Sequence, residues 1–168
     1  MHQLFRYARA VTSTPWLSAE EQRLWRGWLA LTAAVPAVLH RELQADAGLS
    51  LPDFDVLVQL SETDDGRLRV SELARSLAWE RSRLSHHVAR MERRGLVVRE
   101  ECPDDGRGAF VVLTAQGRSA IEAAAPHHVR TVRRLLLDPL DDRDVSELAR
   151  LVTTLLERAT ELSTGVRD

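Results

Sequence analysis

Apolar residues recur at helical spacing along most of the chain, and the interruptions of this pattern predict where its helices begin and end. Ser18 followed three residues later by Glu21 fits a capping box. The sequence therefore predicts a long first helix over residues 19–47, which ends at Gly48. Pro36 lies inside this helix and is expected to bend it, because proline removes one backbone hydrogen bond.

The middle of the chain alternates short helical and extended patterns. The predicted elements are a helix begun by Ser50, a strand over 68–70, a helix over 72–78 capped by Ser71, and a helix over 83–94 ended by Gly95. A four-residue connection over 79–82 joins the last two helices. Leu84, Val88 and Met91 share one face of the second of these helices and should be buried.

The last third begins with a hairpin and continues as helix. Strands are predicted over 96–101 and 110–114, separated by a loop over 102–108 that is rich in turn residues. Thr114 is expected to cap a helix that reaches Leu137 and is interrupted by Pro126, and Asp141 to cap an apolar-faced last helix. The predicted fold class is mainly α with a small β-wing, a winged helix-turn-helix.

Composition limits the class of protein. With 168 residues and 44% hydrophobic residues, the chain can bury one core without disulfides or a metal. Cys102 is the single cysteine and cannot form an internal disulfide. No secretory signal or membrane-spanning run is recognisable, so we expect a soluble cytoplasmic protein with no membrane partner.

Local charge is more informative than the net charge of −2. All 23 basic residues are arginine, a usage that also follows from GC-rich codons and is weak support for nucleic-acid binding by itself. Residues 81–99, however, hold six arginines and one acid, Glu92. Such clustering in an acidic chain is typical of a phosphate-binding surface.

The helix over 83–94 can present this charge to duplex DNA. With its apolar stripe turned inward, the opposite face carries Arg83, His86 and Arg90, flanked by Ser82 and Ser85. An α-helix fits the major groove, where arginine pairs with guanine and serine or histidine reach base edges or phosphates. In the hairpin, Arg107 lies at a glycine-flanked tip, where it could enter an A·T-rich minor groove while Asp105 orients it.

Several motifs in order resemble one family of regulators. They are Ser71-Glu-Leu-Ala74, residues 82–92, Arg94-Gly-Leu-Val97, Asp105-Gly-Arg107 and Leu113-Thr-Ala-Gln-Gly117. Together they are similar to the multiple-antibiotic-resistance regulator (MarR) family of bacterial transcription factors. The resemblance implies a homodimer built by N- and C-terminal helices, with an arm and dimerisation helix over 1–50, a winged helix-turn-helix over 51–114 and dimerisation helices over 115–168.

The resemblance also implies a function and a set of contact residues. The expected protein is a transcriptional repressor that is associated with the nucleoid. It is expected to bind double-stranded DNA at a palindromic operator. Its expected DNA contacts are Arg81, Ser82, Arg83, Ser85, His86, Arg90, Asp105 and Arg107. The terminal helices carry more apolar surface than a small DNA-binding head can cover, which independently favours a dimer over a monomer.

A small phenolic or aromatic anion is the expected effector, since many relatives release DNA when one binds. Aromatic surface beside a cation suits such a ligand, and the candidate residues are Trp25, Trp28, His40, Phe54, Arg75 and Trp79. For each of them, core packing or a surface ion pair is an alternative role. No other cofactor is expected.

Other functions remain as alternatives. The chain could be a winged-helix module that binds protein, or a DNA-binding regulator that takes no ligand. An enzyme is not expected, because no nucleophile–base pair or phosphate loop is recognisable. No metal site is expected either, since His86 and His87 point about 100° apart on a helix. Cys102 lies at the base of the wing and is interpreted as an ordinary small residue.

Overall fold

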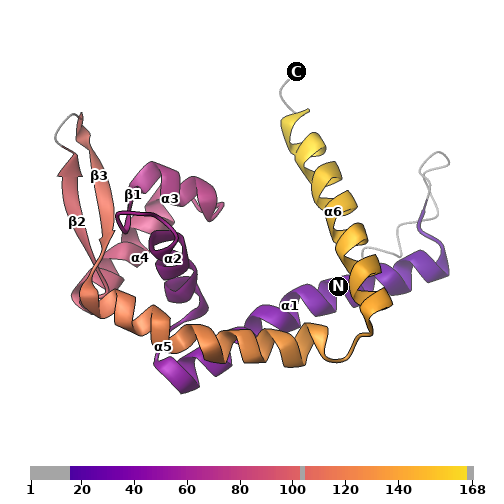
Figure 1. The fold of residues 1–168 in the computed structure, drawn as a ribbon. Coiled ribbons are helices and arrows are strands. Elements are labelled where there is room, and N and C mark those ends of the chain that lie inside the picture. The colour runs from indigo at the N-terminus through magenta and orange to yellow at the C-terminus, as the bar shows by residue number, and fades with distance from the viewer. Residues whose placement is uncertain (1–15, 103–104, 166–168) are drawn as a thin grey trace. The chain divides into compact units, whose positions relative to one another are not determined.

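The computed structural model describes residues 16–102 and 105–165, with the backbone alone for 105–107. Its elements are α1 (Ala19–Ala47), α2 (Leu51–Ser61), β1 (Arg67–Arg69), α3 (Val70–Ser76), α4 (Arg81–Arg93), β2 (Val97–Cys102), β3 (Asp105–Leu113), α5 (Ala115–Val132), the π-helical turn η1 (Arg133–Leu137) and α6 (Asp142–Thr164). The three strands form one antiparallel sheet in the order β1-β3-β2 (Figure 1). The predicted fold class is confirmed.

Side-chain caps set the helix starts that the sequence predicted. At α1, the amide of Glu21 donates to Ser18 Oγ and the Glu21 carboxylate accepts from the Ser18 amide, at 3.2 and 2.6 Å. Thr114 Oγ1 caps α5 by accepting from the Gly117 amide at 2.9 Å. Asp141 caps α6 in the same way. Because these caps are local, the sequence alone was enough to place them.

The helix-turn-helix differs from the prediction at two starts. Helix α3 begins at Val70, not after Ser71, because the Glu72 carboxylate accepts from the Arg69 amide at 3.2 Å and closes the first turn there. Helix α4 begins at Arg81, two residues earlier than predicted. The connection has four residues, as predicted, but lies at 77–80 instead of 79–82. Ala78 within it adopts a left-handed backbone with φ +52°, which lets the chain turn sharply.

The wing is also longer than predicted. Strand β3 begins at Asp105, not at Phe110, and pairs with β2 as far as Cys102. The predicted loop over 102–108 was therefore wrong, because cross-strand pairing overrides the turn propensity of its glycines.

The chain divides into two compact units, and the division falls inside α1 between Ala37 and Val38. The buried core lies in the second unit, where α2, α3, α4, α5 and the sheet meet. Its largest fully buried side chains are Leu43, Leu49, Leu57, Leu60, Leu73, Leu84, Met91, Val56, Val88, Val97 and Val111. The predicted inward stripe of α4, formed by Leu84, Val88 and Met91, is thus confirmed. The predicted domain limits at 50/51 and 114/115 stay predictions.

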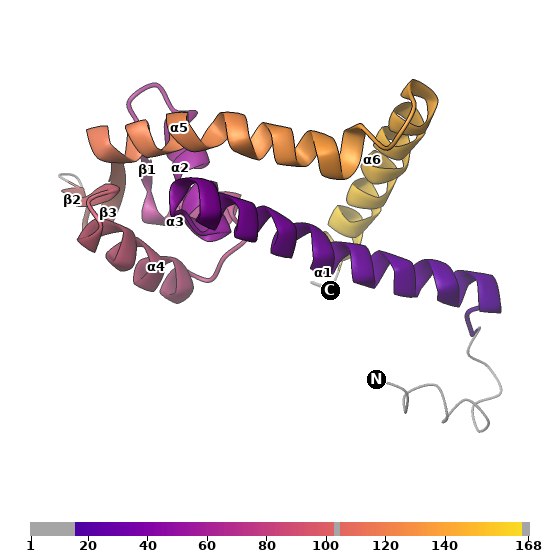
Figure 2. The ribbon, with the colours of Figure 1, turned by 90° about the horizontal axis from the view of Figure 1, so that it is seen from below.

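Helix α5 is anchored directly to the turn that follows α4. Gly95 ends that turn with φ +73°, as predicted for a left-handed stop. Thr114 Oγ1 donates to the carbonyl oxygens of Gly95 and Leu96 at 2.7 and 3.0 Å. A Cβ at Gly117 would overlap the Leu96 carbonyl, so this close approach requires glycine. The contact holds the end of α4 and the base of the wing together, and α4 lies beside the β2–β3 hairpin (Figure 2).

Candidate nucleic-acid interface

Helix α4 buries one face and exposes the other. Leu84, His87, Val88 and Met91 are buried, and the first residues of the helix are exposed. All the candidate DNA contacts on this helix lie on its exposed side: Arg81, Ser82, Arg83, Ser85, His86 and Arg90. The structure therefore presents these six side chains together, and their role as DNA contacts stays a prediction.

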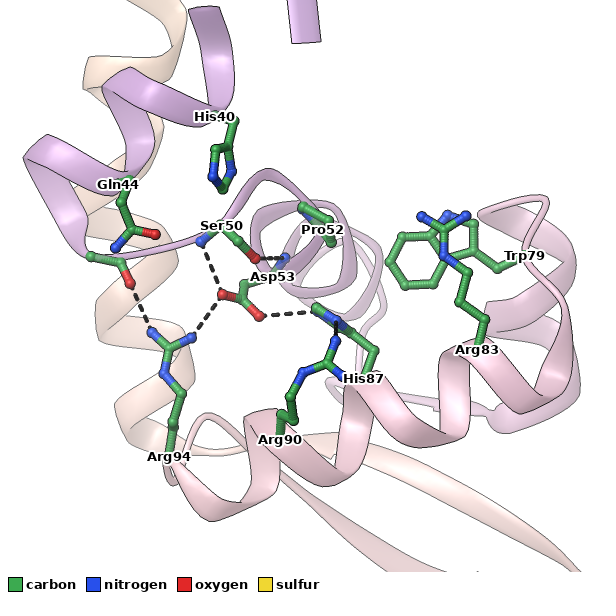
Figure 3. A pocket seen from close by; sticks show the side chains of 11 residues that line it. His40, Gln44, Ser50, Pro52, Asp53, Trp79, Arg83, His87, Arg90 and Arg94 are labelled. Atoms are coloured by element: carbon green, nitrogen blue, oxygen red, sulfur yellow. Dashed lines mark hydrogen bonds and ion pairs between the residues drawn. The ribbon is translucent and has the colours of Figure 1, made fainter. Parts of the chain in front are cut away.

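Two of the exposed arginines are held by neighbours in the free protein. The Arg83 guanidinium lies over the Trp79 ring, with Cζ 4.4 Å from the ring centroid. Nη2 of Arg90 donates to Nδ1 of His87 at 2.8 Å. Both guanidinium groups lie at the rim of a pocket (Figure 3). Each would have to leave its present contact to reach a base edge.

That pocket is open to solvent and has a volume of about 780 Å³. Its lining comes from the end of α1, the start of α2, the α3–α4 connection and α4: His40, Gln44, Gly48, Ser50, Pro52, Asp53, Trp79, Arg83, His87, Arg90 and Arg94 (Figure 3). Three of these residues are arginines and only one is an acid, so the pocket suits an anion.

Asp53 is the single acid of this pocket, and it is almost fully buried. Its Oδ2 accepts from the Ser50 amide at 2.9 Å and from Nη1 of Arg94 at 2.7 Å, and its Oδ1 lies 3.0 Å from Nε2 of His87. Burial by itself would raise the pKa of Asp53. Hydrogen bonds from His87, from the Ser50 amide and hydroxyl and from Arg94 outweigh burial and hold the pKa well below its usual range. Asp53 therefore carries a charge that fixes α2 to α4.

A second hollow, of about 430 Å³, lies between the start of α3, the start of α4 and β3. Arg69, Ser71, Arg81 and Ser85 contribute its polar groups. Sequence reasoning missed Arg69 and Ser71 as candidate contacts. The alternation Arg67-Leu68-Arg69 was the available signal, since it places both arginines on one face of a strand, where they flank the Phe110 ring.

The candidate effector residues fall in different places. His40 and Trp79 line the larger pocket. Phe54 belongs to the core and stacks on His128 with ring centroids 4.3 Å apart, and Arg75 is exposed on α3. Trp25 and Trp28 are exposed on α1 within the first compact unit. The structure thus brings two of the six together and does not test the role of any.

Cys102, Asp105 and Arg107 lie in the two long strands of the wing. The backbones of Asp105 and Arg107 lie in β3, and their side chains are outside the described residues. Cys102 is buried with a free thiol. Within residues 16–102 and 105–165, no three His, Cys, Asp or Glu side chains come together as metal ligands. None of the helices in the same described ranges is long and apolar enough to cross a bilayer.

Comparison with known proteins identifies the family. The MarR family profile matches residues 47–108. AbsC, a MarR family transcriptional regulator from Streptomyces coelicolor, is 40% identical over 88% of this chain and 99% of its own, with a TM-score of 0.82. Sco3205, a MarR family regulator of the same organism solved in complex with DNA, is 40% identical over 86% and 91%, with a TM-score of 0.81.

A curated relative extends the similarity beyond Streptomyces. The uncharacterised HTH-type transcriptional regulator YfiV of Bacillus subtilis is 28% identical over 85% of this chain and 89% of its own. These proteins are transcriptional regulators, which confirms that the chain is not an enzyme. The chain belongs to the MarR family of transcriptional regulators.

Proposed function

We propose that the protein is a repressor that binds a palindromic duplex operator as a homodimer and is controlled by a small aromatic anion. The observation that carries the proposal is the exposed face of α4, where Arg81, Arg83 and Arg90 lie together on a helix whose other face is fixed in the core. Sco3205, which shares 40% identity, was solved in complex with DNA. A protein of this kind would act in the bacterial cytoplasm, on the nucleoid.

The smaller hollow supports a phosphate contact beside α4. Arg69 and Arg81 bring two cations to it, and the hydroxyls of Ser71 and Ser85 can donate to phosphate oxygens. The hollow lies between β3 of the wing and the start of α4. Backbone phosphates bound there would fix the register of α4 in the major groove.

Exposed apolar side chains support the dimer. In the first compact unit, Leu24, Trp25 and Trp28 of α1 are exposed. Helix α6 has no buried residue, and Leu151, Val152, Leu155, Leu156 and Leu162 of this helix are exposed. A monomer does not normally leave such surface in water. A second copy of the chain would cover it and hold two α4 helices about 34 Å apart, one turn of DNA.

The larger pocket supports an anionic effector. Trp79 offers aromatic surface, and the arginines Arg83, Arg90 and Arg94 offer positive charge around the single carboxylate of Asp53. Because Arg83 and Arg90 also belong to the exposed face of α4, an anion that drew them into the pocket would withdraw them from DNA. This competition would couple effector binding to release of the operator.

Replacing Arg83 by alanine tests whether α4 recognises bases of the operator. If Arg83 pairs with a guanine, Arg83→Ala should weaken operator binding by about 1–3 kcal/mol and relax the base preference at one operator position in each half-site. The operator is first selected from random duplexes with the wild-type protein, and base preference is then measured by competition binding.

Arg150→Ala is the matched control for this experiment, because Arg150 is exposed on α6 and pairs only with Glu147 among the contacts described. The control should bind the operator as the wild type does. An Arg83→Ala variant with unchanged preference at every position would contradict a base contact by Arg83. Failure of the wild type to select any duplex would favour a protein-binding module.

A further inference from the structure

We propose that His87 is a positioning residue whose protonation state decides whether the Arg90 guanidinium stays in the larger pocket or turns toward DNA. The inference rests on the proposed DNA-binding role of α4. It assigns a function to a buried histidine that lies on the inward side of α4 and has no place among the expected DNA contacts.

The contacts of His87 define its tautomer. A guanidinium can only donate hydrogen bonds, so Nδ1 of His87, 2.8 Å from Nη2 of Arg90, must be the acceptor. The ring is then neutral and carries its proton on Nε2. Nε2 lies 3.0 Å from Oδ1 of Asp53, and no other polar partner of Nε2 is found among the described residues (Figure 3). His87 thus connects Asp53 of α2 to Arg90 of α4.

Protonation would break one side of this connection and strengthen the other. A proton taken up from solvent on Nδ1 removes the lone pair that accepts from Arg90 and places two cations against each other. On the other side, a charged ring binds the Asp53 carboxylate more strongly. The His87 side chain is 8% exposed and its ring meets the edge of Trp79 with centroids 5.4 Å apart. Arg90 is exposed, so Arg90 is the group that moves.

The other charged groups around His87 decide how easily the proton binds. Asp53 and Asp55 of α2 favour the charged ring, and burial raises the pKa of Asp55, so this second acid is the weaker of the two influences. Arg83, Arg90 and Arg94 on the α4 side oppose it. His40 of α1 faces the same pocket with Nδ1 accepting from the Leu51 amide at 3.2 Å. Loss of Arg90 from the pocket removes the nearest of the opposing cations.

The consequence is a pH dependence of DNA binding with a defined sign. The neutral ring holds Arg90 away from DNA, and the protonated ring releases it. Operator binding should therefore take up a proton, and affinity should rise as the pH falls and the His87 ring becomes protonated. One linked proton can change the affinity by at most about tenfold per pH unit.

The DNA measurement uses a background without the exposed histidine of the same helix. His86→Gln removes a group that could itself bind phosphate when protonated. In that background the affinity for the selected operator should rise roughly three- to tenfold from pH 7.5 to pH 6.0. The His86→Gln/His87→Gln variant should change less than about twofold over this range, because glutamine accepts from Arg90 at every pH. Equal pH dependence in both variants would overturn the inference.

Arg90→Gln, made in the same His86→Gln background, removes the guanidinium that His87 holds and should also abolish the pH dependence. This variant covers the case in which the His86→Gln/His87→Gln variant does not fold. NMR of the free protein should show the neutral His87 ring protonated at Nε2, with Arg90 guanidinium protons resolved at pH 8 and averaged at pH 5.5. Arg90 signals that stay unchanged while His87 titrates would contradict the inference even if the operator binds. A protein that binds no duplex at any pH contradicts the proposed function instead, and the NMR result still decides the role of His87.

Discussion

Asp53→Asn should destabilise the protein by about 3 kcal/mol at neutral pH. The substitution keeps the shape of the side chain and removes the charge that Arg94 and His87 share. Arg94 would then lose its charged partner, while keeping its hydrogen bond to the Gly48 carbonyl at 2.8 Å. The free energy of unfolding, measured by urea denaturation at pH 7, checks the expected loss.

The pH dependence of the stability difference between the wild type and Asp53→Asn is a second readout. The pKa of Asp53 is lower in the folded protein than in the unfolded chain, so its contribution is fully present above the ordinary carboxyl pKa of about 3.9. The contribution is lost as the pH falls below that value, because the unfolded chain then takes up the proton first. The stability gap between wild type and Asp53→Asn should therefore narrow below about pH 4. A difference in the free energy of unfolding that is small at pH 7, or that becomes larger in acid, would show that the Asp53 carboxylate does not link α2 to α4.

Leu155→Glu should lower the affinity for a two-half-site operator by about 10²–10⁴-fold. Leu155 is 54% exposed on α6, so a charge there does not disturb the core of the single chain. The substitution would place a carboxylate in the proposed contact with a second copy of the chain. The two winged helix-turn-helix domains of the dimer would then separate. Sedimentation equilibrium measures the dissociation, and operator titration measures the loss of affinity.

Glu157→Lys is the control for the dimer experiment. Residue 157 lies on nearly the opposite face of α6 from Leu155, and it is exposed. This variant should remain dimeric and bind the operator normally. If Leu155→Glu is monomeric and still binds both half-sites with wild-type affinity, the spacing of two heads does not govern recognition. If the wild type is itself a monomer, α6 has another role.

The sequence was sufficient to predict the features that depend on residues close together in the chain. The start of α1 follows from Ser18 and Glu21, which bond to each other three residues apart. The stripe of Leu84, Val88 and Met91 follows from helical spacing. By contrast, the true start of α4 depends on the left-handed backbone of Ala78, a residue type that gives no signal for that conformation.

The larger pocket could not be predicted from the sequence because its contacts join distant parts of the chain. Asp53 and Arg94 are 41 positions apart and pair only once α2 and α4 are folded together. Sequence spacing placed Arg83 and Arg90 on the outer face of the helix, which is where they lie. It could not indicate that Trp79 and His87 hold their guanidinium groups at a pocket, since side-chain direction depends on the tertiary neighbours.

DNA binding through the arginines of α4 and of the smaller hollow should make operator affinity depend strongly on salt concentration. Affinity for the selected operator is measured by fluorescence anisotropy at several salt concentrations, with a scrambled duplex beside it. A plot of the logarithm of affinity against the logarithm of salt concentration should have a steep negative slope, with a loss of about a thousandfold or more between roughly 50 and 200 mM salt. The operator should be bound more tightly than the scrambled duplex throughout. A flat line, or equal affinity for the two duplexes, would contradict sequence-specific DNA binding by this surface.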